Sequence, residues 1–205
     1  MLSINLGGIT GELYDEFCRW LESPGTVANL DVVFVQETWR ISSDFRLPHW
    51  SWVGSGAKPV SGQGVATLIN TAYAQPAVIR TREVRVGRIL QVMVPAKGDK
   101  QGRFLNLVNV YQHAKVSESP QTYDKRDGIW KALEGLLAAT PSRHYLCMAG
   151  DFNTDLLTAP GVATRFTSQH GERVLARDQH RFQDLAWKIV LVIIWLARLL
   201  CVWRS

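Results

Sequence analysis

The sequence is poor in cysteine, and the cysteines it has are not grouped. Cys18, Cys147 and Cys201 are the only three, and they lie far apart without a CxxC or Cys/His pattern. Structural zinc sites and disulfide scaffolds both need clustered cysteines, so this spacing argues against each of them. The first residues also lack a basic segment followed by a long apolar core, which argues against a signal peptide. We therefore expect a protein of a reducing, intracellular compartment.

Internal repeats and low-complexity linkers are likewise absent from the sequence. The 205 residues are 46% hydrophobic and 20% charged, which is typical of a folded globular chain and argues against global disorder. This length suits one substantial domain. The formal net charge of +5 is compatible with a polyanionic partner such as nucleic acid but does not require one.

The sequence has no clear transmembrane helix, although one apolar run, extended back to Leu185, reaches the minimum length of roughly 17 residues. The run from Ile189 to Trp203 is shorter than the roughly 20 residues that cross a bilayer. Arg198 interrupts it, and an arginine near the centre of a membrane helix costs on the order of 2.5–3.5 kcal/mol. For residues 186–203 we therefore favour a buried C-terminal helix, or the boundary of a reading frame or gene model, over a membrane anchor.

Hydrophobic patterning predicts a chain in which strands alternate with helices. Apolar runs of strand type lie at residues 2–6, 30–35, 65–69, 103–110 and 145–149, and a hairpin at 78–94 turns near Gly87. Helical periodicity is present at residues 10–22, 122–139 and 172–185. This order predicts an α/β protein built from layered sheets and helices.

Aromatic residues add two narrower expectations. Leu13, Phe17, Trp20 and Leu21 are spaced as one apolar stripe of the first helix, which should face the core. Trp50 and Trp52 alternate with polar residues, which favours packing in a strand over stacking against a base on the surface.

Polar residues follow several of the predicted strands directly. The strand ending at Ala149 breaks at a glycine and is followed by Asp151 and Asn153, while Asn5, Glu37 and Tyr111 stand at the ends of three earlier strands. Each has a plainer interpretation alone: a turn-capping amide for Asn5, an exposed loop residue for Glu37 and a core tyrosine for Tyr111. Open α/β sheets bind ligands beyond the carboxyl ends of their strands, so we expect these residues to share one site.

These residue types predict metal-assisted phosphodiester hydrolysis. Glu37 and the amide of Asn5 offer the oxygen ligands that Mg²⁺ prefers, with Mn²⁺ as an alternative cation. Asp151 can orient and deprotonate the attacking water, while Asn153 and Tyr111 can donate hydrogen bonds to the phosphate.

The predicted hairpin carries arginines that a phosphate substrate could contact. Arg80 and Arg82 share one face of its first strand, so both are candidates for substrate binding, although a solvated outer face is the ordinary role of such residues. His113, just past Tyr111, is expected to be a surface loop residue.

Three segments occur in a distinctive order: Val33 to Trp39 (VFVQETW), Val108 to Tyr111 (VNVY) and Ala149 to Asn153 (AGDFN), preceded by Ile4-Asn5. This order and spacing resemble the endonuclease/exonuclease/phosphatase superfamily, in particular the apurinic-endonuclease-like domain of non-LTR retrotransposons. The match is strongest over residues 1–157. The resemblance implies a four-layer α/β sandwich with two mixed β-sheets flanked by helices, forming one domain at residues 1–185 with the apolar tail at 186–205 outside it.

The resemblance also implies an activity. It indicates a magnesium-dependent nuclease or phosphatase with Glu37 on the metal, Asp151 on the water, and Tyr111 and Asn153 near the phosphate. The basic residues favour DNA as the partner. We expect a monomer, located in the nucleus if the chain is a retroelement nuclease.

One part of the family pattern is missing. The family ends with further strands that carry an Asp-His pair facing the phosphate, whereas the contexts of His170 and His180 do not match this pair. We therefore expect a domain that lacks its C-terminal strands and has impaired hydrolysis. Two alternatives stay open: a catalytically inactive binding or membrane-attached remnant, and a phosphatase or phospholipid phosphodiesterase of the same superfamily.

Overall fold

The computed structural model describes residues 1–9, 11–57, 63–114 and 120–153. The elements of this part, in chain order, are β1 (Leu2–Asn5), α1 (Gly11–Leu21), α2 (Pro24–Asn29), β2 (Val32–Gln36), β3 (Ser43–Arg46), β4 (Trp50–Ser55), β5 (Val65–Asn70), the short 3-10 helix η1 (Pro76–Val78), β6 (Arg80–Arg85), β7 (Ile89–Pro95), β8 (Phe104–Tyr111), α3 (Pro120–Ala139) and β9 (Tyr145–Asp151).

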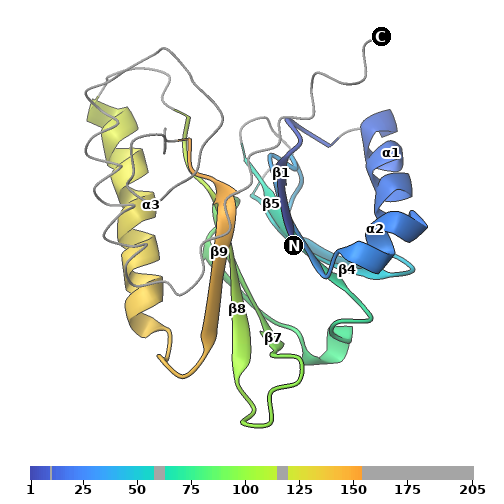
Figure 1. Cartoon of the computed structure of the whole chain (residues 1–205). Coiled ribbons are helices and arrows are strands. Elements are labelled where there is room, and N and C mark those ends of the chain that lie inside the picture. Colours follow the sequence, from blue (N-terminus) through green and yellow to red (C-terminus); the bar gives the residue numbers. More distant parts are fainter. Residues whose placement is uncertain (10, 58–62, 115–119, 154–205) are drawn as a thin grey trace, which may run out of the picture.

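The strands form two mixed sheets that face each other. One has five strands in the order β1-β2-β5-β4-β3, and the other has four in the order β6-β7-β8-β9. In each sheet one pair is parallel, β1 with β2 and β8 with β9, and the remaining pairs are antiparallel. Helices α1 and α2 cover the outside of the first sheet and α3 covers the outside of the second (Figure 1). This confirms the α/β architecture with two mixed sheets flanked by helices.

The central strands are buried on both faces, which explains why they appear in the sequence as continuous apolar runs. In β2, Val32 and Phe34 belong to the core between the sheets, whereas Val33 and Val35 pack towards α1. In β9, Cys147 and Ala149 line the core between the sheets, and Met148 packs in the layer beneath α3. Side chains alternate across a strand, so a strand between two layers needs apolar residues at every position.

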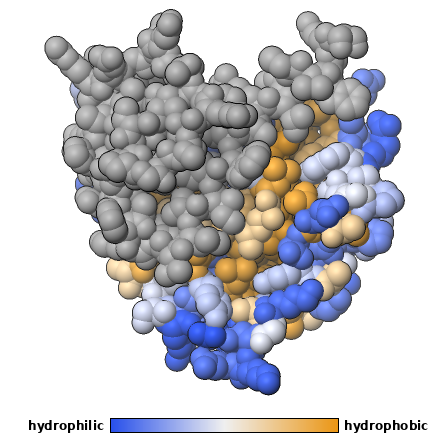
Figure 2. All heavy atoms as spheres, in the orientation of Figure 1, coloured by the Kyte–Doolittle hydropathy of each residue, from blue (hydrophilic) through white to orange (hydrophobic). Residues whose placement is uncertain are grey.

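Apolar surface also reaches the outside of the molecule near the edge strands. Figure 2 shows apolar residues gathered in the middle of the face where β1 and β9 lie, with hydrophilic residues towards its lower and right margins. In the described part of the chain, β1 and β9 are the outer strands of their sheets at this face.

The first helix differs from its expected packing. Phe17 and Leu21 are buried, but Leu13 and Trp20 are 40% and 36% exposed. Trp20 stacks on Phe17, with 5.6 Å between the ring centroids, instead of entering the core. The prediction that all four apolar residues face the core was therefore wrong for Leu13 and Trp20, because the contact between α1 and the sheet is narrower than the apolar stripe.

Two short elements were not expected from the sequence. The Ser23-Pro24-Gly25 segment ends α1, but it also begins α2, because the Ser23 hydroxyl accepts a hydrogen bond from the Thr26 N–H and Pro24 occupies the first helical turn. Strand β3 is the second such element. It pairs with β4, whose Trp50 and Trp52 are fully buried, so these tryptophans do not stack on a ligand at the surface.

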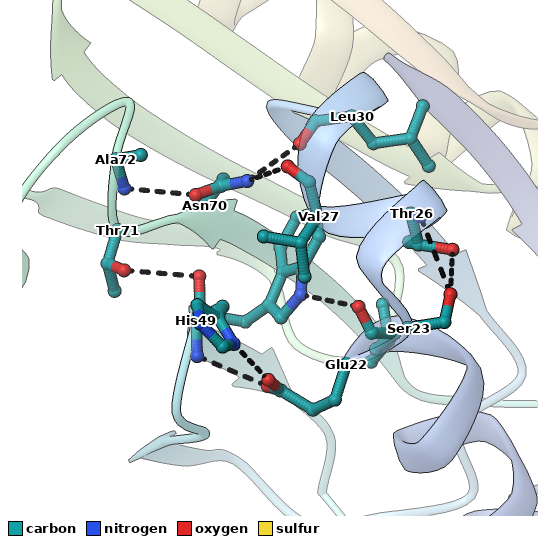
Figure 3. A network of polar contacts seen from close by, with 11 residues as sticks. Glu22, Ser23, Thr26, Val27, Leu30, His49, Asn70, Thr71 and Ala72 are labelled. Atoms are coloured by element: carbon teal, nitrogen blue, oxygen red, sulfur yellow. Dashed lines mark hydrogen bonds and ion pairs between the residues drawn. The ribbon is translucent and has the colours of Figure 1, made fainter.

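A polar network joins α1 and α2 to the loops that flank β4 and β5 (Figure 3). Asn70 is 3% exposed and donates to the carbonyl oxygens of Val27 (2.9 Å) and Leu30 (3.0 Å), while its own oxygen accepts from the Ala72 N–H (2.9 Å). Its side chain therefore satisfies main-chain groups of α2 and of the turn after β5.

We expect Asn70→Ala to lower the free energy of unfolding by about 2–3 kcal/mol, because it leaves these buried groups without partners. Urea unfolding measures the effect. Asn29→Ala is the matched control, since Asn29 is exposed and makes one side-chain bond, to the Gly25 carbonyl at 2.8 Å. Equal losses in the two variants would contradict the role given to Asn70.

The helix expected at 172–185 and the apolar tail at 186–205 lie outside the described residues, as do the expected loss of the C-terminal strands and the expected domain boundary. Within the described ranges, no helix has the length and apolar character needed to span a bilayer.

Candidate active site

The two parallel strand pairs bring the predicted site residues to one end of the sandwich. In the first sheet Asn5 is in register with Gln36, which immediately precedes Glu37. In the second sheet Tyr111 is in register with Asp151. Because parallel strands end on the same edge of a sheet, all of these groups lie at the carboxyl ends of the strands.

Asn5 connects the two sheets at this end. Its amide nitrogen donates to Glu37 Oε1 at 2.9 Å and to Asp151 Oδ2 at 2.8 Å. Its oxygen accepts from the Gly7 N–H at 3.0 Å. Carboxylates can only accept hydrogen bonds, so this orientation of the amide follows from its partners. Asn5 therefore caps a turn, as its plainer interpretation predicted, and also brings two carboxylates to one nitrogen.

The backbone around Asp151 depends on a glycine. Gly150 has a φ of +148°, and a Cβ atom there would lie 1.9 Å from the Val110 carbonyl oxygen of the neighbouring strand. Only glycine allows this approach, and the strand then turns at Asn153, whose φ is +45°. The Asn153 N–H donates to Asp151 Oδ1 at 2.9 Å, which fixes the carboxylate against its own turn.

Tyr111 meets Glu37 from the opposite sheet. Burial, and next the neighbouring Glu37 carboxylate, raise the pKa of Tyr111, while Arg88 opposes the shift. Tyr111 therefore stays protonated at neutral pH and serves as a donor. The Arg88 guanidinium lies over the Tyr111 ring, 4.5 Å from its centroid.

A buried amide pair joins the sheets directly behind these residues. Gln36 Nε2 donates to Asn109 Oδ1 at 2.8 Å. Asn109, which is 0% exposed, donates in turn to the carbonyl oxygens of Val35 and Ala66 in the facing sheet, at 3.1 and 2.7 Å. These bonds hold the two sheets in one relative position, so the distances across the site are set by the scaffold.

Arg126 of α3 supports the same site from behind. It is 4% exposed, and its guanidinium donates to the carbonyl oxygens of Asn153 (3.2 Å) and His113. Gln112 links these segments further, because its carbonyl accepts from Asn153 Nδ2 at 2.8 Å and its side-chain amide donates to the Arg126 carbonyl at 3.2 Å.

The sequence analysis placed neither Arg88 nor Arg126 at the site. A usable signal for Arg126 was its position three and seven residues before Ile129 and Leu133, which places a charge on the buried face of α3. For Arg88 the signal was its place immediately before a buried strand, which sets it next to the end of the following antiparallel strand.

The carboxylate oxygens of the site are suitable ligands for a hard divalent cation. Two carboxylates, from Glu37 and Asp151, converge on one amide nitrogen, and Glu37 is partly open to solvent. Mg²⁺ is commonly held by one or two carboxylates and keeps several waters, so these residues fit it. Within the described ranges, no group of three or more His, Cys, Asp or Glu side chains forms a metal cage. The oxygen of Asn5 faces Gly7, so direct ligation by Asn5 would require its amide to turn.

Arg80 and Arg82 do not join this site. Arg80 is in register with Met93, which is in register with Asn106, near the start of β8 rather than its end. Both arginines are exposed on the edge strand β6. The structure thus separates them from the strand ends at which Asp151 and Tyr111 meet.

His113 is partly buried rather than fully solvated. Burial, and then the positive charges of Arg88, Lys125 and Arg126, lower its pKa to about 4. An unfolded chain would bind a proton at this histidine near its ordinary pKa of about 6.5, so the unfolded state binds more protons between those two values. Stability should therefore fall as the pH drops through this window.

We expect His113→Gln to reduce that acid sensitivity. Urea unfolding at neutral pH and again at about pH 4.5 would show a smaller loss of stability in the variant than in the wild type. An unchanged difference between the two pH values would mean that His113 does not contribute.

Comparison with known proteins identifies the fold. No protein-family model matches the sequence, and no curated protein matches it. Among solved structures, an AP endonuclease from Leishmania major is similar with a TM-score of 0.64 and 16% identity over 91% of this chain and 65% of its own. The catalytic domain of Xenopus laevis APE2 is similar with a TM-score of 0.56 and 14% identity over 91% of this chain and 67% of its own.

A third structure, an endonuclease/exonuclease/phosphatase family protein from Leptotrichia buccalis, has a TM-score of 0.50 and 15% identity over 89% of this chain and 72% of its own. The chain thus spans 65% of the length of the Leishmania enzyme. At these identities the likeness concerns the fold. The chain has the fold of the endonuclease/exonuclease/phosphatase proteins, as the sequence resemblance implied.

Proposed function

We propose that this chain is a metal-dependent phosphodiesterase of the nuclease type that acts on DNA. The observation that carries the proposal is the convergence of Glu37 and Asp151 on the amide of Asn5, from strands of opposite sheets. Buried or half-buried carboxylates that share one donor are costly unless they serve a cation or a reacting group. The fold, which the Leishmania major AP endonuclease and the APE2 catalytic domain share, and the net charge of +5 support this proposal.

Each residue has a distinct task in this proposal. Glu37 would hold the Mg²⁺ ion, and a bound ion would stabilise negative charge on the phosphate. Asp151 accepts the proton of the attacking water, and the Asn153 N–H keeps its carboxylate oriented. Tyr111 supplies a protonated hydroxyl to a phosphoryl oxygen. One amide hydrogen of Asn153 is donated to the Gln112 carbonyl, and the other can be donated to a phosphoryl oxygen.

The experiment is nicking of supercoiled plasmid DNA by the whole chain. We expect nicking in the presence of Mg²⁺ and none when the metal is chelated. Glu37→Gln should raise the Mg²⁺ concentration needed for half-maximal nicking by at least about tenfold, and Glu16→Gln, on the exposed face of α1, should leave it unchanged. Nicking that survives chelation would overturn the metal requirement, and nicking that is absent from every preparation would favour an inactive remnant.

The proposal extends to a retroelement origin. Its support is the order of the VFVQETW, VNVY and AGDFN segments, which resembles the endonuclease domain of non-LTR retrotransposons. Genomic DNA that follows the coding sequence tests it. We expect this DNA to encode an Asp-His pair followed by reverse-transcriptase-like sequence, and unrelated sequence there would contradict this origin.

A further inference from the structure

The second sheet carries a basic pocket at the end opposite the candidate active site. The pocket encloses about 420 Å³ and is lined by residues from β6, β7 and the segments that lead into β8 and β9. Phe104, at the start of β8, forms part of its wall, whereas Tyr111 lies at the end of the same strand. Seven residues of extended strand span roughly 23 Å, so the pocket is spatially separate from Asp151 and Glu37.

The charged side chains that line this pocket are arginines. Arg80, Arg103 and Arg143 line it together with His144, and none of the described residues that line it carries a carboxylate. Asp99 offsets the charge of Arg103, with contacts of 2.7 and 2.8 Å to its guanidinium. Arg80 and Arg143 form no ion pair with any residue that the structure describes. The pocket thus presents two uncompensated guanidinium groups and one that is compensated.

Several contacts hold these groups in place. The Arg80 guanidinium lies 4.8 Å from the centroid of the Phe104 ring, and Arg103 lies 4.6 Å from that of Tyr145. Cation–π stacking of this kind restricts a guanidinium while leaving its N–H groups able to donate at the edge. The positions of Arg80 and Arg103 are therefore set by neighbouring rings rather than by free rotation in solvent.

His144 contributes a further donor. Its Nδ1 accepts a hydrogen bond from the Phe104 N–H at 3.1 Å, so in the neutral ring the proton belongs to Nε2. The ring also packs edge-on against Phe104, with 5.6 Å between centroids. The pocket is accordingly lined by N–H donors from several segments and by almost no acceptor groups of side chains, which is the arrangement that an oxyanion requires.

We propose that this pocket binds a phosphoryl group, held by Arg80, Arg143 and His144. The ligand is either a small phosphate compound or a phosphodiester of a nucleic acid strand, and the two share this chemistry. Arginine forks match the oxygen geometry of phosphate, and a lining of basic side chains attracts an anionic group. The proposal does not depend on the activity assigned to the other end of the sandwich.

The test measures binding of pyrophosphate and of a short single-stranded oligonucleotide by calorimetry, at low salt and with chelator present so that no metal site contributes. We expect saturable pyrophosphate binding that weakens at least tenfold in an Arg80→Gln/Arg143→Gln double variant. Arg19→Gln on the exposed face of α1 should bind like the wild type. Asp151→Ala should also bind like the wild type, which separates this pocket from the candidate active site.

The two probes distinguish the sources of the phosphate. Oligonucleotide binding that is tighter than pyrophosphate binding, and lost in the same double variant, would identify a nucleic acid strand. Pyrophosphate binding with no oligonucleotide binding would identify a small phosphate compound. The proposal is overturned if pyrophosphate does not bind saturably, or if the double variant binds both probes as the wild type does. Because both substituted arginines are exposed, we expect the double variant to fold, and circular dichroism would verify it.

Discussion

Replacing Asp151 by alanine should abolish most of the phosphodiesterase activity while leaving the fold intact. In the proposed mechanism this carboxylate takes the proton of the attacking water, and a positioned general base contributes about 10²–10⁴-fold to the rate. Asp151 is 8% exposed, and its neighbours at the site are donors: the amide of Asn5 and the N–H of Asn153. No other described carboxylate hydrogen-bonds both of these groups, so none is positioned to act as the general base instead of Asp151.

The rate of plasmid nicking in Mg²⁺ measures this loss. Asp151→Asn keeps the shape of the side chain but not its basicity, so it should be nearly as inactive as Asp151→Ala. The matched control is Asp44→Ala, because Asp44 is an exposed carboxylate on β3, far from the strand ends that form the site. Equal activity of Asp151→Ala and wild type would remove Asp151 from the mechanism.

Loss of the Arg126 side chain should impair both stability and turnover. The guanidinium is buried and donates to the carbonyl oxygens of His113 and Asn153, which belong to the segments that follow β8 and β9. Arg126→Met fills similar space but leaves both oxygens without this donor. We expect a loss of about 2–4 kcal/mol in the free energy of unfolding.

Turnover should fall because Asn153 would no longer be held at its strained φ of +45°. A misplacement on the order of 1 Å can cost about 10²-fold, so we expect kcat to drop by roughly 10–100-fold with little change in KM. Rates are compared well below the unfolding temperature of the variant. Arg126→Lys keeps a donor, so it should recover part of kcat as well as part of the stability. If Arg126 had only a structural role, Arg126→Lys would recover stability but not kcat. Arg19→Met, on an exposed face, is the control.

Asp151 and Arg126 differ in how far the sequence alone predicts their roles. Asp151 stands out in the sequence, because an apolar run that ends in Gly-Asp has one natural interpretation, a buried strand that delivers a carboxylate at its end. Arg126 stands on a helix among ordinary polar residues. Its function depends on which carbonyl oxygens lie opposite that helix, and pattern along the chain does not contain this information.

The sequence by itself determined the layered α/β class, the positions of most strands along the chain and the polar residues at their carboxyl ends. Period-two and period-3.6 patterns are local, and so they remain readable in the sequence. It did not determine the separation of Arg80 from the site or the exposure of Leu13 and Trp20. Those follow from which strands become neighbours and how wide each contact is.

Tertiary structure alone decided how the site is assembled. Asn5 and Asp151 are separated by almost the whole described chain, yet the pairing of two sheets places them 2.8 Å apart. Arg88 and Arg126 reach the same site from a hairpin and a helix for the same reason. Interactions between residues distant in sequence exist only after the sheets have packed, so the chain specifies the chemical groups and the packing specifies which of them can act together.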